Sequence, residues 1–226
     1  MSYQFDFQTV MEQWPIFLRG AWVTVQMILL AILLGFIGGT LCAIGRGNGP
    51  AWLRKLLGAY VEVIRNTPLL IQAYFLIFGL ASSGVRVPIL MGATIALVVN
   101  ISAYTSEIMR AGMDAIHPGQ IEAADCLGLS RWQIYLHVIL QPAMEKVYPA
   151  LVSQYVLLML GSSILSAVGV EELFGVSNRV QSLTYRNFEV FVVLGAIYLA
   201  LALLLKIGFA LLGMLLFPRR RKLGNA

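Results

Sequence analysis

The sequence predicts an all-α integral membrane protein with about five transmembrane helices, in a single domain that spans residues 1–226. Of these residues, 59% are hydrophobic and only 12% are charged, which excludes disordered proteins and ordinary soluble proteins. The apolar residues form long continuous runs rather than an alternating pattern, which argues against a transmembrane β-barrel. The runs also leave too few residues for a separate water-soluble domain.

Five apolar runs each contain about 20 residues or more, enough for a helix to cross about 30 Å of hydrocarbon. The runs cover residues 17–44, 57–80, 89–108, 147–168 and 190–216. The N-terminal segment lacks the basic region of a secretory signal, because Asp6 and Glu12 precede the first basic residue, Arg19. We therefore expect the first run to be retained as a membrane span.

An odd number of spans places the two termini on opposite sides of the membrane. The densest basic cluster is Arg219–Lys222, and basic segments favour the cytoplasm. With this tail inside, the inner segments hold the tail together with Arg46, Arg54, Lys55, Arg110, Arg131 and Lys146, whereas the outer segments hold Arg19, Arg86, Arg179 and Arg186. This asymmetry predicts a cytoplasmic C-terminus, an external N-terminus, and cytoplasmic segments near residues 46–55 and 110–146.

The second run contains the sequence IRNTPLLIQ, in which Pro68 cannot donate a backbone hydrogen bond. A helix there either kinks or restarts with Thr67 as its cap. In one interpretation Arg65 extends to the cytoplasmic headgroups and pairs with Glu62, three residues earlier on the same helical face. In the other, the run is a broken helix that lines a polar path. The sequence favours the first interpretation.

Polar residues crowd the cytoplasmic half of the third run. Asn100, Tyr104 and Glu107 share one helical face, because residues 100 and 107 are two turns apart. Polar groups at this depth are costly against lipid and should face protein or water. These residues are candidates for a translocation path, with Ser162 and Ser163 of the fourth run. Interhelical hydrogen bonds would explain the polar face of the third run equally well.

The sequence contains no motif for chemistry of its own. It lacks the G-x-x-x-x-G-K-[ST] loop that cradles nucleotide phosphates. The two histidines, His117 and His137, have no partner at the spacing of metal ligands, and the two cysteines, Cys42 and Cys126, indicate neither a disulfide framework nor a metal site. We therefore expect neither enzyme activity nor a cofactor in this chain.

A polar segment, EAADCLGLSRWQIYLHVILQPA, separates the third and fourth runs. His117-Pro118-Gly119 just before it predicts a helix start, and Gly128 suits a left-handed helix end. Ser130 and Gln133 match the S-x-x-Q capping box, which predicts a second helix at once. The segment is therefore predicted to form a compact elbow of two short helices on the cytoplasmic side.

This segment resembles the EAA loop of ABC importer permeases, in which Glu-Ala-Ala is followed by three residues, Gly, nine residues and Ile-x-Leu-Pro. Glu122-Ala123-Ala124 and Gly128 keep the spacing, whereas Gln141 stands at the expected proline and Pro142 follows it. The stretches YVEVIRNTPLLIQ, AYTSEIMRAGMDAIHPGQIEAADCLGLSRWQ and SSILSAVGVEELF are similar to the polar amino acid branch of that family. Leu160-Gly161 departs from the Lys-Asp or Lys-Asn of that branch.

The resemblance implies a type I ABC importer permease fold with a coupling loop at about residues 112–141. It implies a subunit of the bacterial inner membrane that serves an ATP-driven importer of polar amino acids. Glu122, Ala123, Ala124 and Gly128 would couple it to the ATPase. The implied partners are two ATP-binding subunits that hold ATP and Mg, a second permease chain, identical or paralogous, and a periplasmic or lipid-anchored binding protein, with no nucleic acid.

Two other functions remain as alternatives. An ATP-independent secondary transporter or channel would explain the polar third run but leaves the elbow without a purpose. A membrane scaffold would explain the elbow but not the polar cluster around Glu107.

Overall fold

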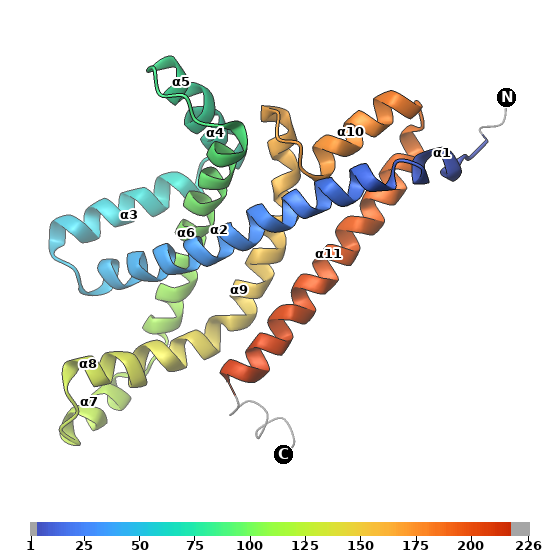
Figure 1. Cartoon of the computed structure of the whole chain (residues 1–226). Helices are drawn as coiled ribbons and strands as arrows, with labels where there is room; N and C mark the ends of the chain where they lie inside the picture. The colour runs from blue at the N-terminus through green and yellow to red at the C-terminus, as the bar shows by residue number, and fades with distance from the viewer. Residues whose placement is uncertain (1–3, 218–226) are drawn as a thin grey trace.

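The structure, a computed structural model, describes residues 4–217, and every regular element within that range is helical (Figure 1). In chain order the elements are α1 (Phe7–Met11), α2 (Trp14–Asn48), α3 (Ala51–Arg65), α4 (Leu69–Tyr74), the π-helical turn η1 (Phe75–Gly79), α5 (Leu80–Ser82), α6 (Ile89–Asp114), α7 (Pro118–Cys126), α8 (Arg131–Gln133), the π-helical segment η2 (Ile134–Leu140), α9 (Gln141–Gly161), the 3₁₀ helix η3 (Ser162–Val168), α10 (Leu173–Thr184) and α11 (Asn187–Leu216).

Four helical segments among the described residues are long and apolar enough to cross a membrane. They are Trp14–Asn48, Ile89–Asp114, Arg131–Val168 and Asn187–Leu216, and the bent pair Ala51–Arg65 and Leu69–Ser82 makes up to five. This result confirms the prediction of an all-α membrane protein with about five spans. The basic tail Arg219–Lys222, on which the predicted orientation depends, lies outside the described residues.

The second span is broken. The axes of the helices before and after Asn66–Pro68 differ by 109°. The Thr67 hydroxyl donates to the Val63 carbonyl at 2.8 Å and so closes the end of α3, whereas Pro68 itself stands at the N-cap of α4. The predicted alternative in which the second helix restarts with Thr67 as its cap is therefore wrong. The favoured interpretation is also wrong about Arg65, which lies 3.8 Å from Glu107 rather than pairing with Glu62.

The core of the molecule forms where α2 crosses α6 (Figure 1). Two glycines of α2 allow this close approach. A Cβ atom on Gly39 would lie 2.6 Å from the Ser102 carbonyl oxygen of α6, and a Cβ on Gly35 would collide with Ile101. Since no larger residue fits at these two positions, the α2–α6 contact depends on them.

The fourth span begins earlier than predicted. Helical structure runs without interruption from Arg131 to Val168, through two prolines, instead of starting at residue 147. Pro142 lies in the first turn of α9, directly after the π-helical segment η2. A wider π-turn is a known way for a helix to accommodate a missing hydrogen bond. The elbow is consequently continuous with the span.

Candidate functional site

The elbow (α7, α8 and the turn between them) has the predicted local structure. Pro118 begins α7, and the His117 ring accepts a hydrogen bond from the Gly119 N–H at 3.1 Å. Gly128 has a left-handed backbone with φ of +74°. The Leu129 N–H then donates to the Ala124 carbonyl at 3.2 Å, as in a glycine-terminated helix end. These contacts confirm the turn predicted at Gly128.

The second half of the elbow begins with a complete capping box. The Ser130 N–H donates to the Gln133 side-chain oxygen at 2.9 Å, and the Gln133 N–H donates to the Ser130 hydroxyl oxygen at 3.4 Å. Two large apolar side chains of the elbow, Leu127 and Trp132, are 80% and 68% exposed. The elbow therefore combines a locally fixed backbone with an exposed apolar surface.

The four predicted coupling residues do not share one environment. Glu122 and Ala123 are exposed on α7, whereas Ala124 is only 5% exposed and α7 packs against η2. No heavy atom would lie within 4 Å of a Cβ on Gly128. Glu122 and Ala123 are thus available to a partner, while Ala124 and Gly128 serve the internal structure of the elbow.

The polar face of α6 is bonded to the broken second span. The Asn100 side-chain amide donates to the Gln72 side-chain oxygen at 3.1 Å. The Gln72 amide in turn donates to the Ile64 carbonyl at 2.8 Å and to the Thr67 carbonyl at 3.1 Å. Tyr60 of α3 donates to the Val99 carbonyl of α6 at 2.8 Å.

One carboxylate connects three elements at the end of this face. Glu107 lies 2.8 Å from the Arg46 guanidinium of α2 and 2.7 Å from that of Arg110 of α6. Arg65, at the end of α3, lies 3.8 Å from the same carboxylate, and its guanidinium carbon is 5.6 Å from the centre of the Tyr104 ring. The structure therefore brings Asn100, Tyr104 and Glu107 into one line of contacts with the second span.

The other two candidate residues, Ser162 and Ser163, bond within their own helical segment. The hydroxyls of Ser162 and Ser163 donate to Met159 and Leu160 carbonyls of their own helical segment, at 2.7 and 2.9 Å. Sequence reasoning missed Gln72, Tyr60 and Arg46 as partners of the polar face. Gln72 carried a signal, since it is a lone amide in the apolar run after Pro68.

A buried carboxylate lies at the opposite end of the helices from the elbow. Glu172 is 0% exposed and caps α10, where it accepts hydrogen bonds from the Phe174 and Gly175 N–H groups at 3.0 and 2.9 Å. It also accepts one from the Tyr198 hydroxyl of α11 at 2.9 Å. Burial raises the pKa of the Glu172 carboxyl above its ordinary value, although these donors oppose the shift.

Residues 4–217 contain no group of three or more His, Cys, Asp or Glu side chains that could hold a metal ion. Cys42 is buried and Cys126 is exposed, and both are free thiols.

Comparison with known proteins identifies the family to which the chain belongs. The family model described as "Binding-protein-dependent transport system inner membrane component" matches residues 31–216. The nopaline transport system permease protein NocM of Agrobacterium fabrum is 32% identical over 205 residues, which cover 86% of this chain and 85% of NocM. The glutamine transport system permease protein GlnP of Escherichia coli K12 is 30% identical over 205 residues, covering 89% and 93% of the two chains.

Solved structures of similar proteins share the fold. A chain from the crystal structure of an amino acid ABC transporter with histidines superimposes with a TM-score of 0.85 at 32% identity, covering 93% of this chain and 99% of that one. A chain of the MetNI methionine ABC transporter, in an inward-facing conformation, gives a TM-score of 0.76 at 20% identity, covering 91% and 98%.

Proposed function

The chain belongs to the family of binding-protein-dependent transport system inner membrane components, and from this premise we propose that it imports a polar amino acid or an opine as the permease subunit of an ABC importer. The relatives support this substrate class, since their names specify nopaline, glutamine and, for a protein of Bacillus subtilis with 31% identity, arginine. The resemblance of the chain extends over three separate segments of its sequence, one of which includes the elbow.

The observation that carries the proposal is the elbow between α6 and the fourth span. A loop that transmits force must be short, fixed in shape and continuous with the helices it moves. The elbow meets these conditions through the left-handed Gly128, the Ser130–Gln133 capping box and the unbroken helix from Arg131 onward. We assign its exposed surface, with Glu122, Ala123, Leu127 and Trp132, to contact with an ATP-binding subunit.

In this mechanism, ATP and Mg are bound by the partner and not by this chain, which lacks a phosphate-binding loop. ATP closes a pair of ATP-binding subunits, and the elbows of two permease chains move with them. The second permease chain is either a copy of this one or a paralogue. A periplasmic or lipid-anchored binding protein delivers the substrate to the outer side of the permease pair.

The proposed orientation has the N-terminus outside and the elbow in the cytoplasm. The end of α2, the start of α3 and the elbow lie at the same end of the molecule (Figure 1). This end carries Arg46, Arg54, Lys55 and Arg131, as the positive-inside rule requires of a cytoplasmic surface in a bacterial inner membrane.

The proposed translocation path borders the polar face of α6, with Asn100, Tyr104 and Glu107, and the segment with Ser162 and Ser163. The break in the second span supports this assignment. Irregular backbone at membrane depth is tolerated where it is buried in protein or lines a water-filled cavity, and discontinuous helices commonly form transporter binding sites. The break adjoins this face, because Gln72 bonds both to the carbonyls at the break and to Asn100.

A matched pair of glycine variants tests the proposal in the assembled importer. Gly128 and Gly84 both have left-handed backbones, with φ of +74° and +88°, and neither would meet a neighbour on gaining a Cβ. Valine costs about 1–2 kcal/mol of strain at each. We expect Gly128→Val to lower ATP-driven uptake in proteoliposomes about tenfold, the factor that corresponds to about 1.4 kcal/mol. Gly84→Val, on the turn after α5, should insert and transport normally.

The same proteoliposomes distinguish the alternatives. An ATP-independent transporter would accumulate substrate on an ion gradient without ATP, and a scaffold would show no uptake under either condition. Normal uptake by Gly128→Val, or uptake that does not require ATP, would contradict the proposed coupling. The ATP-binding subunit should also co-purify with the wild-type chain.

A further inference from the structure

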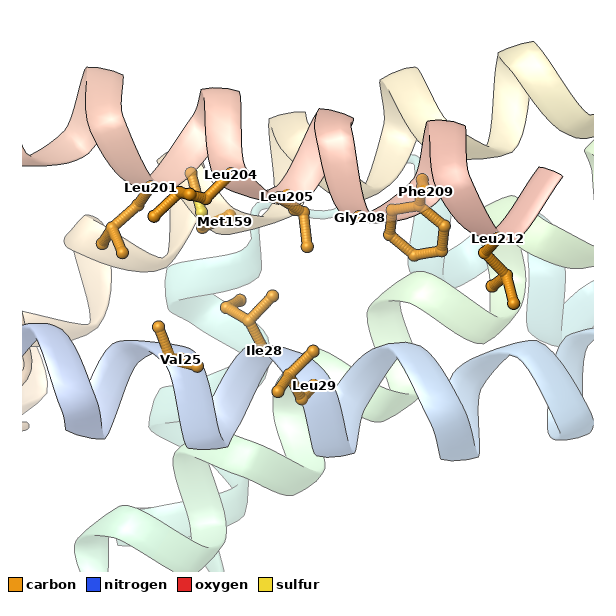
Figure 2. Close-up of a pocket in the computed structure, with 10 residues that line it drawn as sticks. All are labelled: Val25, Ile28, Leu29, Met159, Leu201, Leu204, Leu205, Gly208, Phe209 and Leu212. Carbon is orange, nitrogen blue, oxygen red and sulfur yellow. The ribbon is translucent and has the colours of Figure 1, made fainter. Parts of the chain in front are cut away.

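An apolar groove runs between α2, α9 and the C-terminal half of α11. Figure 2 shows Leu201, Leu205, Phe209 and Leu212 of α11 facing Ile28 and its neighbours on α2, with Met159 of α9 behind them. The cavity between them has a volume of about 410 Å³, and no charged or polar side chain lines it. The described groove is therefore an opening within the bundle and not a flat lipid-facing surface.

The groove continues along α11. A second cavity of about 240 Å³ shares Leu29, Phe209 and Leu212 with the first and reaches Leu216. The distance from Leu201 to Leu216 along an α-helix is about 22 Å. Two tyrosines line the second cavity: the Tyr148 hydroxyl donates to the Phe209 carbonyl, and Tyr155 is only 3% exposed. The groove is thus long, narrow and almost entirely apolar.

Water is a poor occupant for the main cavity. A buried water needs two to four polar partners, and this lining offers no polar side chain. An empty cavity of this size is also unfavourable, because its lining atoms lose their packing contacts. The acyl chains of membrane lipids, in contrast, can fill the cavity.

The groove opens toward the hydrocarbon. Its rim residues Leu29, Leu204 and Leu212 are 53%, 64% and 41% exposed, whereas the floor residues Ile28 and Met159 are only 2% and 3% exposed. The rim is continuous with other exposed apolar side chains of the same two helices, including Leu33, Leu203 and Ile207. Since α2 and α11 are long and apolar enough to span a membrane, this surface lies at the depth of the hydrocarbon.

We propose that the groove is a binding site for a single acyl chain of a membrane phospholipid. The size of the cavity separates this occupant from a helix of a partner subunit. A helix about 10 Å in diameter and about 22 Å long fills about 1,700 Å³, whereas the two cavities along this length hold about 410 and 240 Å³, so a partner helix could cover the groove but not enter it. An acyl chain is narrow, flexible and wholly apolar, as the lining requires.

Gly208 provides a way to fill the groove without disturbing the backbone. It lines the main cavity, and a Cβ added there would meet no heavy atom within 4 Å. Gly195 is the matched control, because it lies on the same helix, is exposed, meets no neighbour either and does not line the groove. Gly208→Phe should occupy the site, and Gly195→Phe should leave it open.

The test uses the importer reconstituted in vesicles of phosphatidylethanolamine and phosphatidylglycerol. A small share of the phosphatidylglycerol carries a photoactivatable diazirine on one acyl chain, and labelled residues are identified by mass spectrometry. We expect label on the buried floor residues Ile28 and Met159 of the wild type. Leu97, which is 0% exposed and does not line the groove, sets the background. In Gly208→Phe the floor signal should fall to that background, while Gly195→Phe should match the wild type.

Two results would overturn the proposal. In the first, Ile28 and Met159 of the wild type carry no more label than Leu97, as expected if a protein segment covers the groove. In the second, the floor is labelled equally in the wild type and in Gly208→Phe. Leu204→Trp is a second variant that narrows the mouth from an exposed rim position, and it should lower the floor signal even where Gly208→Phe fails to insert.

Discussion

At the scale of single residues, Glu107 is the only carboxylate in contact with Arg46 and Arg65 within the described residues, and it also pairs with Arg110. The Glu107 side chain is 25% exposed, so solvent screens these interactions only in part. Removing its charge would leave three guanidinium groups from three elements close together. Glu107 therefore holds α2, α3 and α6 against one another at this point.

We expect Glu107→Gln to lower the stability of the purified chain by about 2 kcal/mol, between the values typical of exposed and buried ion pairs. Asp114→Asn is the control, since Asp114 pairs with Arg110 alone and its side chain is 62% exposed. That change should stay within about 0.5 kcal/mol. Thermal melting in detergent measures both, and equal shifts would show that Glu107 has no special role.

Glu172 predicts a pH dependence. Because burial raises the pKa of its carboxyl in the folded chain, the stabilisation from this group is complete below the unfolded value of about 4.3. It is lost as the pH rises through the folded value. In Glu172→Gln this slope of melting temperature against pH should disappear. Glu171→Gln, at a neighbour whose side chain is 70% exposed, should keep it; parallel profiles for wild type and Glu172→Gln would contradict the argument.

The sequence placed Asn100, Tyr104 and Glu107 on one helical face correctly but did not identify their partners. Helical periodicity is a local property, whereas Gln72 and Arg46 are 28 and 61 residues away from the groups they contact. The incorrect pairing of Arg65 with Glu62 arose for the same reason. Glu62 and Arg65 both lie in α3, but Arg65 lies beside Glu107 of α6, and the Glu62 carboxylate accepts a hydrogen bond from the Asn66 side chain at 3.5 Å.

At the scale of elements, Gln72 explains how the second span can be broken inside a membrane. Proline and the turn leave the Ile64 and Thr67 carbonyls without helical partners, and unpaired backbone groups are expensive in hydrocarbon. The Gln72 amide donates to both, while its oxygen accepts from Asn100 of α6. One side chain therefore satisfies the break and fixes it to the third span.

Gln72→Leu should destabilise the chain by about 1–3 kcal/mol, because it leaves buried polar groups without partners. Uptake should fall as well, since the two halves of the span lose their fixed angle. Thr67→Val is the control, because it removes the hydroxyl that accepts one Gln72 hydrogen bond but leaves the two Gln72 bonds to the backbone carbonyls in place. Melting curves and uptake of both variants provide the comparison, and an equal effect of the two changes would rule out a specific role for Gln72.

The elbow shows which elements can be predicted from a sequence. Its N-cap, its glycine turn and its capping box all depend on residues within a few positions of one another, and all three were predicted correctly. The π-helical segment η2 and the continuous helix through Pro142 were not predicted. The fourth run was predicted to begin at residue 147, whereas η2 and α9 carry the helix through Pro142.

At the scale of the whole molecule, the two cysteines provide a direct test of orientation. Cys126 is exposed on the elbow, whereas Cys42 is buried inside the first span. A membrane-impermeant maleimide should therefore label Cys126 in inverted membrane vesicles but not in intact cells. Bound ATP-binding subunits should protect it. Cys126→Ser should abolish the signal, and labelling of intact cells would place the elbow outside and contradict the proposed coupling.

The class of the fold and the number of spans followed from hydropathy, because each span must satisfy its own backbone in hydrocarbon. The arrangement of the spans in three dimensions did not follow from hydropathy. The 109° bend and the groove beside α11 depend on contacts between distant segments. The sequence indicated a kink or a restart at Pro68 but did not favour a broken helix, and it contains no local signal for the direction in which the chain continues.

The glycine contact between α2 and α6 has a mechanical consequence. With Gly39 so near the Ser102 carbonyl that a Cβ would lie 2.6 Å away, these two helices cannot slide past each other without a collision of backbones. They must reorient as a rigid body. Any alternation of access to the two membrane sides then requires hinges elsewhere, at the break in the second span and along the loosely packed α11.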